Sequence, residues 1–109
     1  MCLDLMEVRF PDRFLWGAAT AAQQIEGNKV HSDWWRVEED GLLPHRSGDA
    51  CHSWNRWADD IVLLQEMGLN AYRFSCEWAR IEPTPGGFDQ TALDTYRRML
   101  EALRAAGIE

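Results

Sequence analysis

The sequence predicts an α/β fold built on a parallel sheet, because strand-like and helix-like segments alternate along its 109 residues. Two amphipathic patterns, at residues 53–67 and 89–106, each end just before a glycine. After a leader at residues 1–13, the order is strand, long connection, helix, strand, helix and the start of another strand. A chain of this length is enough for one small domain.

The first unit begins with a short apolar run at residues 14–19, which predicts a buried strand. A helical turn is expected at residues 32–39, with Ser32 or Asp33 as its N-cap. Residues 40–50 carry two glycines, a proline, a serine and two aspartates, and they predict a loop.

The clearest helix of the sequence covers residues 53–67, with Ser53 as a candidate N-cap. Its apolar side chains recur at spacings of three and four and form one face. They are Trp54, Trp57, Ala58, Ile61 and Leu64. Gly68 is placed to end this helix.

The second unit starts with a predicted strand at residues 70–75. Residues 79–88 contain two prolines and two glycines and predict a loop. Asp89 can cap a second long helix that runs to about Ala106. Ile108 then reads as the start of a third strand.

Charge and cysteine content exclude some partners and indicate a compartment. The net charge of −7 argues against nucleic acid and against an anionic membrane, because both need a basic patch. The longest apolar run, residues 61–64, is too short to span a bilayer. Cys2, Cys51 and Cys76 have no CxxC spacing, and the N-terminus lacks a secretory signal pattern. These observations predict reduced thiols and a cytoplasmic protein.

A first motif points to a known family. Residues 14–27 read Phe-Leu-Trp-Gly-Ala-Ala-Thr-Ala-Ala-Gln-Gln-Ile-Glu-Gly. This resembles the first-strand motif of the family 1 glycoside hydrolases, the β-glucosidase group. The resemblance implies that Gln24 hydrogen-bonds hydroxyls of the sugar, a task that suits an amide because it offers donors and an acceptor. Where the family usually has Ser-Tyr the chain has Ala22 and Gln23, so the sugar-binding role is assigned to Gln24 and not to Gln23.

A second motif carries the same resemblance. Residues 70–81 read Asn-Ala-Tyr-Arg-Phe-Ser-Cys-Glu-Trp-Ala-Arg-Ile, with Cys76 where the family usually has isoleucine. The resemblance implies that Arg73 lies beside the family's nucleophilic glutamate and keeps it ionised. A permanent cation next to a carboxylate lowers the pKa of that carboxylate.

The resemblance covers about residues 10–109 and implies a fold. We expect the N-terminal part, about two βα units, of a (β/α)8 TIM barrel, so that residues 1–109 form a fragment of one glycoside hydrolase barrel domain. A whole barrel takes about 250 residues, and the remainder of the barrel, in the same or a separate chain, is therefore an expected partner. Trp34 and Trp35 lie in the first βα connection, where barrel enzymes build their sites. They are candidates for the outer, aglycone part of a cleft, whereas the other four tryptophans are expected in the core.

The resemblance also implies an activity. The family hydrolyses O-glycosidic bonds of β-glucosides or related carbohydrates with retention, and no metal or organic cofactor is implied. The family's acid/base glutamate stands in an Asn-Glu-Pro context and its nucleophile in a Glu-Asn-Gly context, and neither occurs here. We therefore expect this chain alone to be inactive. The alternatives are a non-catalytic sugar-binding or barrel-complementing chain, or an inactive fragment.

Other titratable residues are expected to be structural. Chemistry alone would nominate Glu26 and Glu77 as the paired carboxylates of a glycosidase. The resemblance places both in motifs where the family does not use them for acid–base work, so hydrogen bonds to backbone or arginine are expected instead. The three histidines share no metal-ligand spacing, and no metal site is expected.

Overall fold

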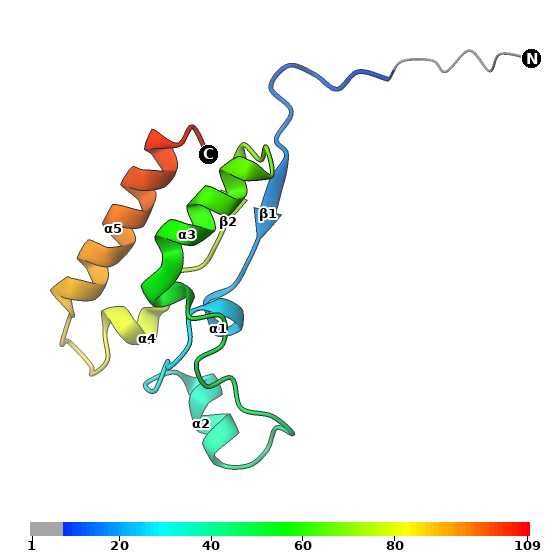
Figure 1. The fold of residues 1–109 in the computed structure, drawn as a ribbon. Coiled ribbons are helices and arrows are strands. Elements are labelled where there is room, and N and C mark those ends of the chain that lie inside the picture. Colours follow the sequence, from blue (N-terminus) through cyan, green and yellow to red (C-terminus); the bar gives the residue numbers. More distant parts are fainter. Residues whose placement is uncertain (1–7) are drawn as a thin grey trace, which may run out of the picture.

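The computed structural model describes residues 8–109 and contains two parallel strands with helices on their connections (Figure 1). The elements in chain order are β1 (Gly17–Ala19), α1 (Ala22–Ile25), α2 (Asp33–Glu39), α3 (Ser53–Glu66), β2 (Ala71–Arg73), α4 (Trp78–Ile81) and α5 (Gln90–Ala105). The predicted α/β order and the two long helices are confirmed. Both strands have three residues and are shorter than the predicted strands at residues 14–19 and 70–75. The predicted burial of the first segment is wrong, because Leu15 is 54% exposed and Trp16 is 47% exposed.

The two strands pair in parallel with a register that aligns their carboxyl ends. Gly17 faces Ala71 and Ala19 faces Arg73. A parallel pair needs a crossover connection, and the chain between the strands supplies it with α1, α2 and α3 (Figure 1).

The chain returns to the sheet at its C-terminal end. The N–H of Tyr72 donates to the carbonyl of Glu109 at 2.8 Å, and the N–H of Glu109 donates to the carbonyl of Asn70 at 2.9 Å. Ile108 is buried beside them. These alternating bonds follow the ladder of a parallel pair and agree with the third strand predicted from Ile108.

Apolar side chains of α3, α5 and the last residues form the first hydrophobic cluster. It contains Ile61 and Leu64 from α3, Leu103 from α5, and Ile108. The two helices lie side by side along the strands (Figure 1). Burying such a side chain stabilises the fold by about 1.5–3 kcal/mol. A second cluster of Ile81, Tyr96 and Met99 attaches α4 to α5.

The ends of the long helices follow local rules, with one correction. The Asp89 carboxylate accepts hydrogen bonds from the first backbone N–H groups of α5, as predicted. At α3 the predicted N-cap Ser53 is wrong, because His52 holds that position in a left-handed conformation. Ser53 is instead the first helical residue, and its hydroxyl donates to Asp60 Oδ2. Gly68 follows α3 with φ +71°, the conformation that ends a helix.

Two single-turn helices were not predicted. One is α1, which follows β1, and the other is α4, which starts just before the predicted loop at residues 79–88 and occupies its first residues. Four residues are too few for a hydrophobic period, so tertiary contacts and caps decide such turns. At α4 the cap is Glu77, whose carboxylate accepts from the N–H of Ala79 at 3.3 Å.

The core prediction for the remaining tryptophans is wrong for two of them. Trp16 is 47% exposed and Trp78 is 61% exposed. Trp16 contacts Phe10 edge to face and Phe14 at a tilt, with ring centroids 4.6 Å apart in each pair, outside the two clusters. Trp78, on α4, contacts Phe88 edge to face with ring centroids 6.3 Å apart, and its Nε1 donates to Glu82 Oε2. Trp54 and Trp57 pack against the clusters as predicted.

Candidate functional site

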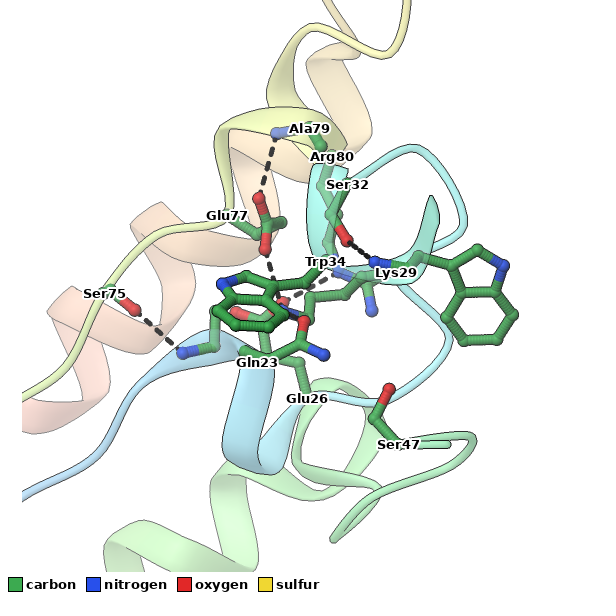
Figure 2. Close-up of polar contacts among 12 residues, drawn as sticks. Gln23, Glu26, Lys29, Ser32, Trp34, Ser47, Ser75, Glu77, Ala79 and Arg80 are labelled. Atoms are coloured by element: carbon green, nitrogen blue, oxygen red, sulfur yellow. Dashed lines mark hydrogen bonds and ion pairs between the residues drawn. The ribbon is translucent and has the colours of Figure 1, made fainter. Parts of the chain in front are cut away.

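The proposed sugar-binding amide lies on α1, directly after β1. Backbone bonds hold this turn to the second strand: the N–H of Thr20 donates to the carbonyl of Arg73 at 2.9 Å. The N–H of Ala22 donates to Ser75 Oγ at 2.8 Å (Figure 2). Gln24 is exposed, and its side chain makes no hydrogen bond within residues 8–109. Its amide is therefore available to a ligand at the carboxyl end of the strands.

The candidate cation Arg73 lies at the same end of the sheet. It is the last residue of β2 and is in register with Ala19, just before the turn that carries Gln24. The side chain is exposed and has no acidic partner within the part of the chain that the structure describes. A guanidinium stays charged at all relevant pH values, so this end of the sheet presents a positive charge.

The candidate aromatic residues lie on α2. Ser32 caps this helix, and its hydroxyl oxygen accepts from the N–H of Trp35 at 3.1 Å (Figure 2). Trp34 is 52% exposed, whereas Trp35 is half-buried. The outward ring of Trp34 offers a flat apolar face of the kind that stacks on rings.

A buried ion pair joins the segments that follow β1 and β2. Glu26 is only 5% exposed, and its Oε2 accepts from Arg80 Nε at 2.8 Å. The Tyr96 hydroxyl donates to Glu26 Oε1 at 2.7 Å and itself accepts from the N–H of Glu77 at 2.7 Å. The Arg80 guanidinium lies over the ring of Trp54, 4.3 Å from its centroid. These two donors satisfy the buried Glu26 carboxylate, which indicates a structural role.

A second set of buried polar residues links α1, α2 and α4. Lys29 is 3% exposed, and its Nζ donates to Gln23 Oε1 and, at 2.9 Å, to Glu77 Oε2 (Figure 2). Gln23 Nε2 donates to Glu38 Oε1 at 2.8 Å. Glu38 Oε2 accepts from both the N–H and the hydroxyl of Ser47 at 2.9 Å. Each buried charge thus has at least two polar partners.

Burial shifts the pKa of three groups near these contacts. Desolvation raises the pKa of the Tyr96 hydroxyl, and its hydrogen bond to Glu26 raises it further. Desolvation also raises the pKa of Tyr72, against the hydrogen bond with Thr20. The pKa of the Cys76 thiol is raised by burial and by the charge of Glu26.

The carboxylates of the site are engaged in structure. Glu26 pairs with Arg80 and Tyr96, and Glu77 caps α4 and pairs with Lys29. These contacts agree with the structural roles expected for both glutamates. Among residues 8–109, no group of three His, Cys, Asp or Glu side chains is arranged to hold a metal ion.

Sequence reasoning missed the buried polar group below the exposed site. Gln23, Lys29, Glu38 and Ser47 come from four separate segments, and no periodic pattern connects them. One signal was available, since Lys29 is the single lysine of the chain and follows the first motif. Its burial was not predicted, because lysine side chains are mostly exposed.

Similarity to known sequences covers nearly the whole chain. The sequence model of glycosyl hydrolase family 1 matches residues 6–109. The "Beta-glucosidase A" of Thermotoga maritima is 38% identical over 109 residues, a match that covers 92% of this chain and 24% of that protein. The chain therefore spans about a quarter of the length of this relative.

Solved structures agree with the fold. The β-glycosidase from Pyrococcus horikoshii superimposes with a TM-score of 0.90 at 47% identity, over 94% of this chain and 24% of that one. A family 1 β-glucosidase from Thermotoga maritima in complex with isofagomine lactam gives a TM-score of 0.83 at 39% identity, over 91% and 25% of the two chains. The predicted N-terminal part of a (β/α)8 barrel is confirmed by these matches.

Proposed function

The chain belongs to glycosyl hydrolase family 1, and from this premise we propose that it is the N-terminal portion of a retaining, β-glucosidase-like enzyme. The observation that carries the proposal is the match over residues 6–109, which includes both strand motifs and the segments between them. The substrates would be β-glucosides or related carbohydrates. The chain would contribute one wall of the site, at the carboxyl ends of β1 and β2.

Two residues of this chain would act in the reaction. Gln24, exposed on α1, would hydrogen-bond sugar hydroxyls through an amide that has no internal partner within residues 8–109. Arg73, at the end of β2, would lie beside the nucleophilic glutamate and keep it ionised. In the retaining reaction this glutamate attacks the anomeric carbon, and a second glutamate protonates the leaving oxygen and then activates water. Both glutamates would come from beyond the strands described here.

Trp34 and Trp35 would border the outer part of the cleft. The exposed ring of Trp34 supports this role more directly than the half-buried ring of Trp35. A sugar ring or an aromatic aglycone could stack on its open face. The proposed reaction uses no metal ion and no organic cofactor.

The chain by itself would be inactive and would need the remainder of the barrel. Leu63 of α3 and Met67, which follows this helix, are more than half exposed, and β1 pairs within the described residues on one side only. Such faces and edges promote association unless other strands and helices cover them.

We also propose that the protein is located in the cytoplasm, a reducing compartment. Cys51 and Cys76 are free thiols, and Cys2 lies outside the described residues. The cytoplasm would keep such thiols reduced. Within residues 8–109, no helix is both long and apolar enough to cross a membrane.

The deciding experiment measures the mass of the native species and its hydrolysis of a β-glucoside in the same sample. We expect activity only in a species heavier than 12.6 kDa that contains the rest of the barrel. Activity from the pure 12.6 kDa chain would contradict the absence of the catalytic glutamates. An assembled barrel that binds sugar without hydrolysis would indicate the non-catalytic alternative.

A further inference from the structure

One amide connects two buried charges of opposite sign. Lys29 and Glu38 are 3% and 5% exposed, and Gln23 lies between them with a hydrogen bond to each. Lys29 comes from the loop after α1, and Glu38 comes from the last turn of α2. Within residues 8–109, Gln23 is therefore the residue of α1 whose side chain hydrogen-bonds to α2.

The chemistry of the partners allows the Gln23 amide one orientation. An ammonium can only donate, so it requires the amide oxygen, and an ionised carboxylate can only accept, so it requires the amide nitrogen. Turning the amide over would place two donors against each other on one side and two acceptors on the other. Both partners are buried, so water does not relieve that mismatch. Gln23 is thus held in one direction.

The direction of Gln23 determines the direction of its neighbour. Both residues lie on α1, a single turn in which successive side chains point about 100° apart. With Gln23 turned inward to Lys29 and Glu38, Gln24 is turned outward, where it is exposed. The other contacts of this turn, from Ser75 and Glu26, connect it to the second βα unit and not to α2.

From this arrangement we propose that Gln23 is a positioning residue that fastens α1 to α2. It sets the direction of Gln24 and its placement relative to Trp34, which α2 carries. The inference rests on the proposed function for the sugar-binding role of Gln24. It goes beyond that function because it assigns a task to a residue where the family usually has tyrosine.

The test uses a charge change that leaves each buried group with a partner. In the Gln23→Glu variant Lys29 keeps an acceptor, but Glu38 loses its donor and faces a second carboxylate. Lys29 still pairs with Glu77 and Glu38 with Ser47, so the fold is expected to survive. The double variant Q23E/E38Q restores a donor opposite the new carboxylate. Gln65→Glu is the matched control, since Gln65 is exposed on α3 and its side chain makes no hydrogen bond within the described residues.

The readouts are hydrogen exchange of the α2 amides and kcat/KM for a β-glucoside, measured on the full chain assembled with the rest of the barrel. In Q23E we expect α2 amides to exchange about tenfold faster, the factor that loss of one strong hydrogen bond produces. We expect kcat/KM to fall about tenfold or more, because a small displacement of a substrate-binding group is costly. The double variant should return both values toward wild type.

Unchanged exchange in Q23E, or an equal change in Q65E, would overturn the inference. A double variant as impaired as the single one would also overturn it, because the effect would then not come from this hydrogen bond. Wild-type protein that hydrolyses no β-glucoside would count against the proposed function alone. In that case the exchange of α2 still decides whether Gln23 joins the two helices.

Discussion

Arg80 and Glu26 form an ion pair across 54 positions of the sequence, with 2.8 Å between Arg80 Nε and Glu26 Oε2. Glu26 follows α1 in the first βα unit, and Arg80 lies on α4 in the second. The same guanidinium also donates to the carbonyl of Gly27. This pair therefore fastens together the two loops that follow β1 and β2, where the proposed site is built.

Replacing Arg80 with methionine should destabilise the assembled protein strongly. Glu26 would remain buried with only the Tyr96 hydroxyl as partner. Removing one partner of a buried pair costs about 3–5 kcal/mol. The loss is measured as a change in the free energy of unfolding in urea.

Arg46→Met supplies the control for this prediction. Arg46 pairs with Glu39 on the surface, with both side chains exposed. Exposed pairs contribute about 0–1 kcal/mol, so this variant should unfold almost as the wild type does. Equal losses of unfolding free energy in the two variants would show that the Arg80–Glu26 pair stabilises the protein no more than a surface pair does.

The Tyr96 hydroxyl should make stability depend on pH in alkaline solution. Its pKa is raised in the folded state, first by burial and then by Glu26, whereas an unfolded tyrosine titrates near its usual value of about 10. Above that pH the unfolded state loses its proton first, so stability falls as pH rises, by at most about 1.4 kcal/mol per pH unit. Below about pH 10 this contribution is fully present.

The measurement compares urea midpoints between pH 9 and 11 for wild type, Tyr96→Phe and Tyr72→Phe. Tyr72 also has a raised pKa, so each variant should remove part of the alkaline slope. Tyr96→Phe should also lower stability at pH 7 by about 1–3 kcal/mol, because the Glu26 carboxylate and the N–H of Glu77 lose their common partner. A slope that is identical in all three proteins would contradict the assignment.

Gly27 should tolerate no side chain. Its φ is +78°, and a Cβ at this position would overlap the carbonyl group of Asp49 and lie 3.0 Å from the Cα of that residue. Gly41 is the matched control, with φ +71° and no atom within 4 Å of the place that a Cβ would take. Gly41→Ala should cost about 1–2 kcal/mol for the left-handed conformation alone. Gly27→Ala should cost about 1–3 kcal/mol more, measured by thermal unfolding, because the backbone must move.

Gln24→Met should weaken sugar recognition without loosening the fold. The side chain is exposed and has no hydrogen bond within residues 8–109, so its replacement leaves no buried group unpaired. We expect kcat/KM for a β-glucoside to fall about tenfold or more, as for the loss of hydrogen bonds to a ligand. Gln65→Met should keep wild-type kinetics. Equal kinetics in Gln24→Met and Gln65→Met would show that Gln24 does not bind the sugar.

Arg73→Met should move the acidic limb of the pH profile. Loss of a cation beside the nucleophile raises the carboxylate pKa by about 1–3 units, so kcat/KM should fall at a higher pH than in the wild type. Arg104→Met, which removes an exposed charge from the end of α5, should leave the profile unchanged. An unmoved acidic limb in Arg73→Met would mean that the arginine has a different role.

The parts of the fold that were predicted correctly are those with local causes. The period of α3 and α5, the Asp89 cap and the glycine after each helix follow from short-range rules. The cap of α3 was not predictable in this way. His52 adopts φ +57° there, and its N–H donates to the carbonyl of Asp49, which depends on how the preceding loop folds.

The exposed candidate residues could be identified from the sequence, whereas the buried polar contacts could not. Gln24 and Arg73 belong to long motifs, and the structure places both at the carboxyl ends of adjacent strands. Their roles remain predictions. The contact of Gln23 with Glu38 joins residues from separate segments across 15 positions, and only the path of the connection brings them together. Sequence spacing carries no signal for such a contact.

The buried charges among residues 8–109 find their partners within the same residues. Glu26, Lys29 and Glu38 are satisfied by residues up to Tyr96, and within residues 8–109 no buried side-chain nitrogen or oxygen lacks a hydrogen bond. If this segment replaced the corresponding segment of a relative's barrel, its buried ion pairs and hydrogen bonds would therefore be transferred together. Apolar faces, strand edges and the exposed Arg73 would have to be matched at the junction.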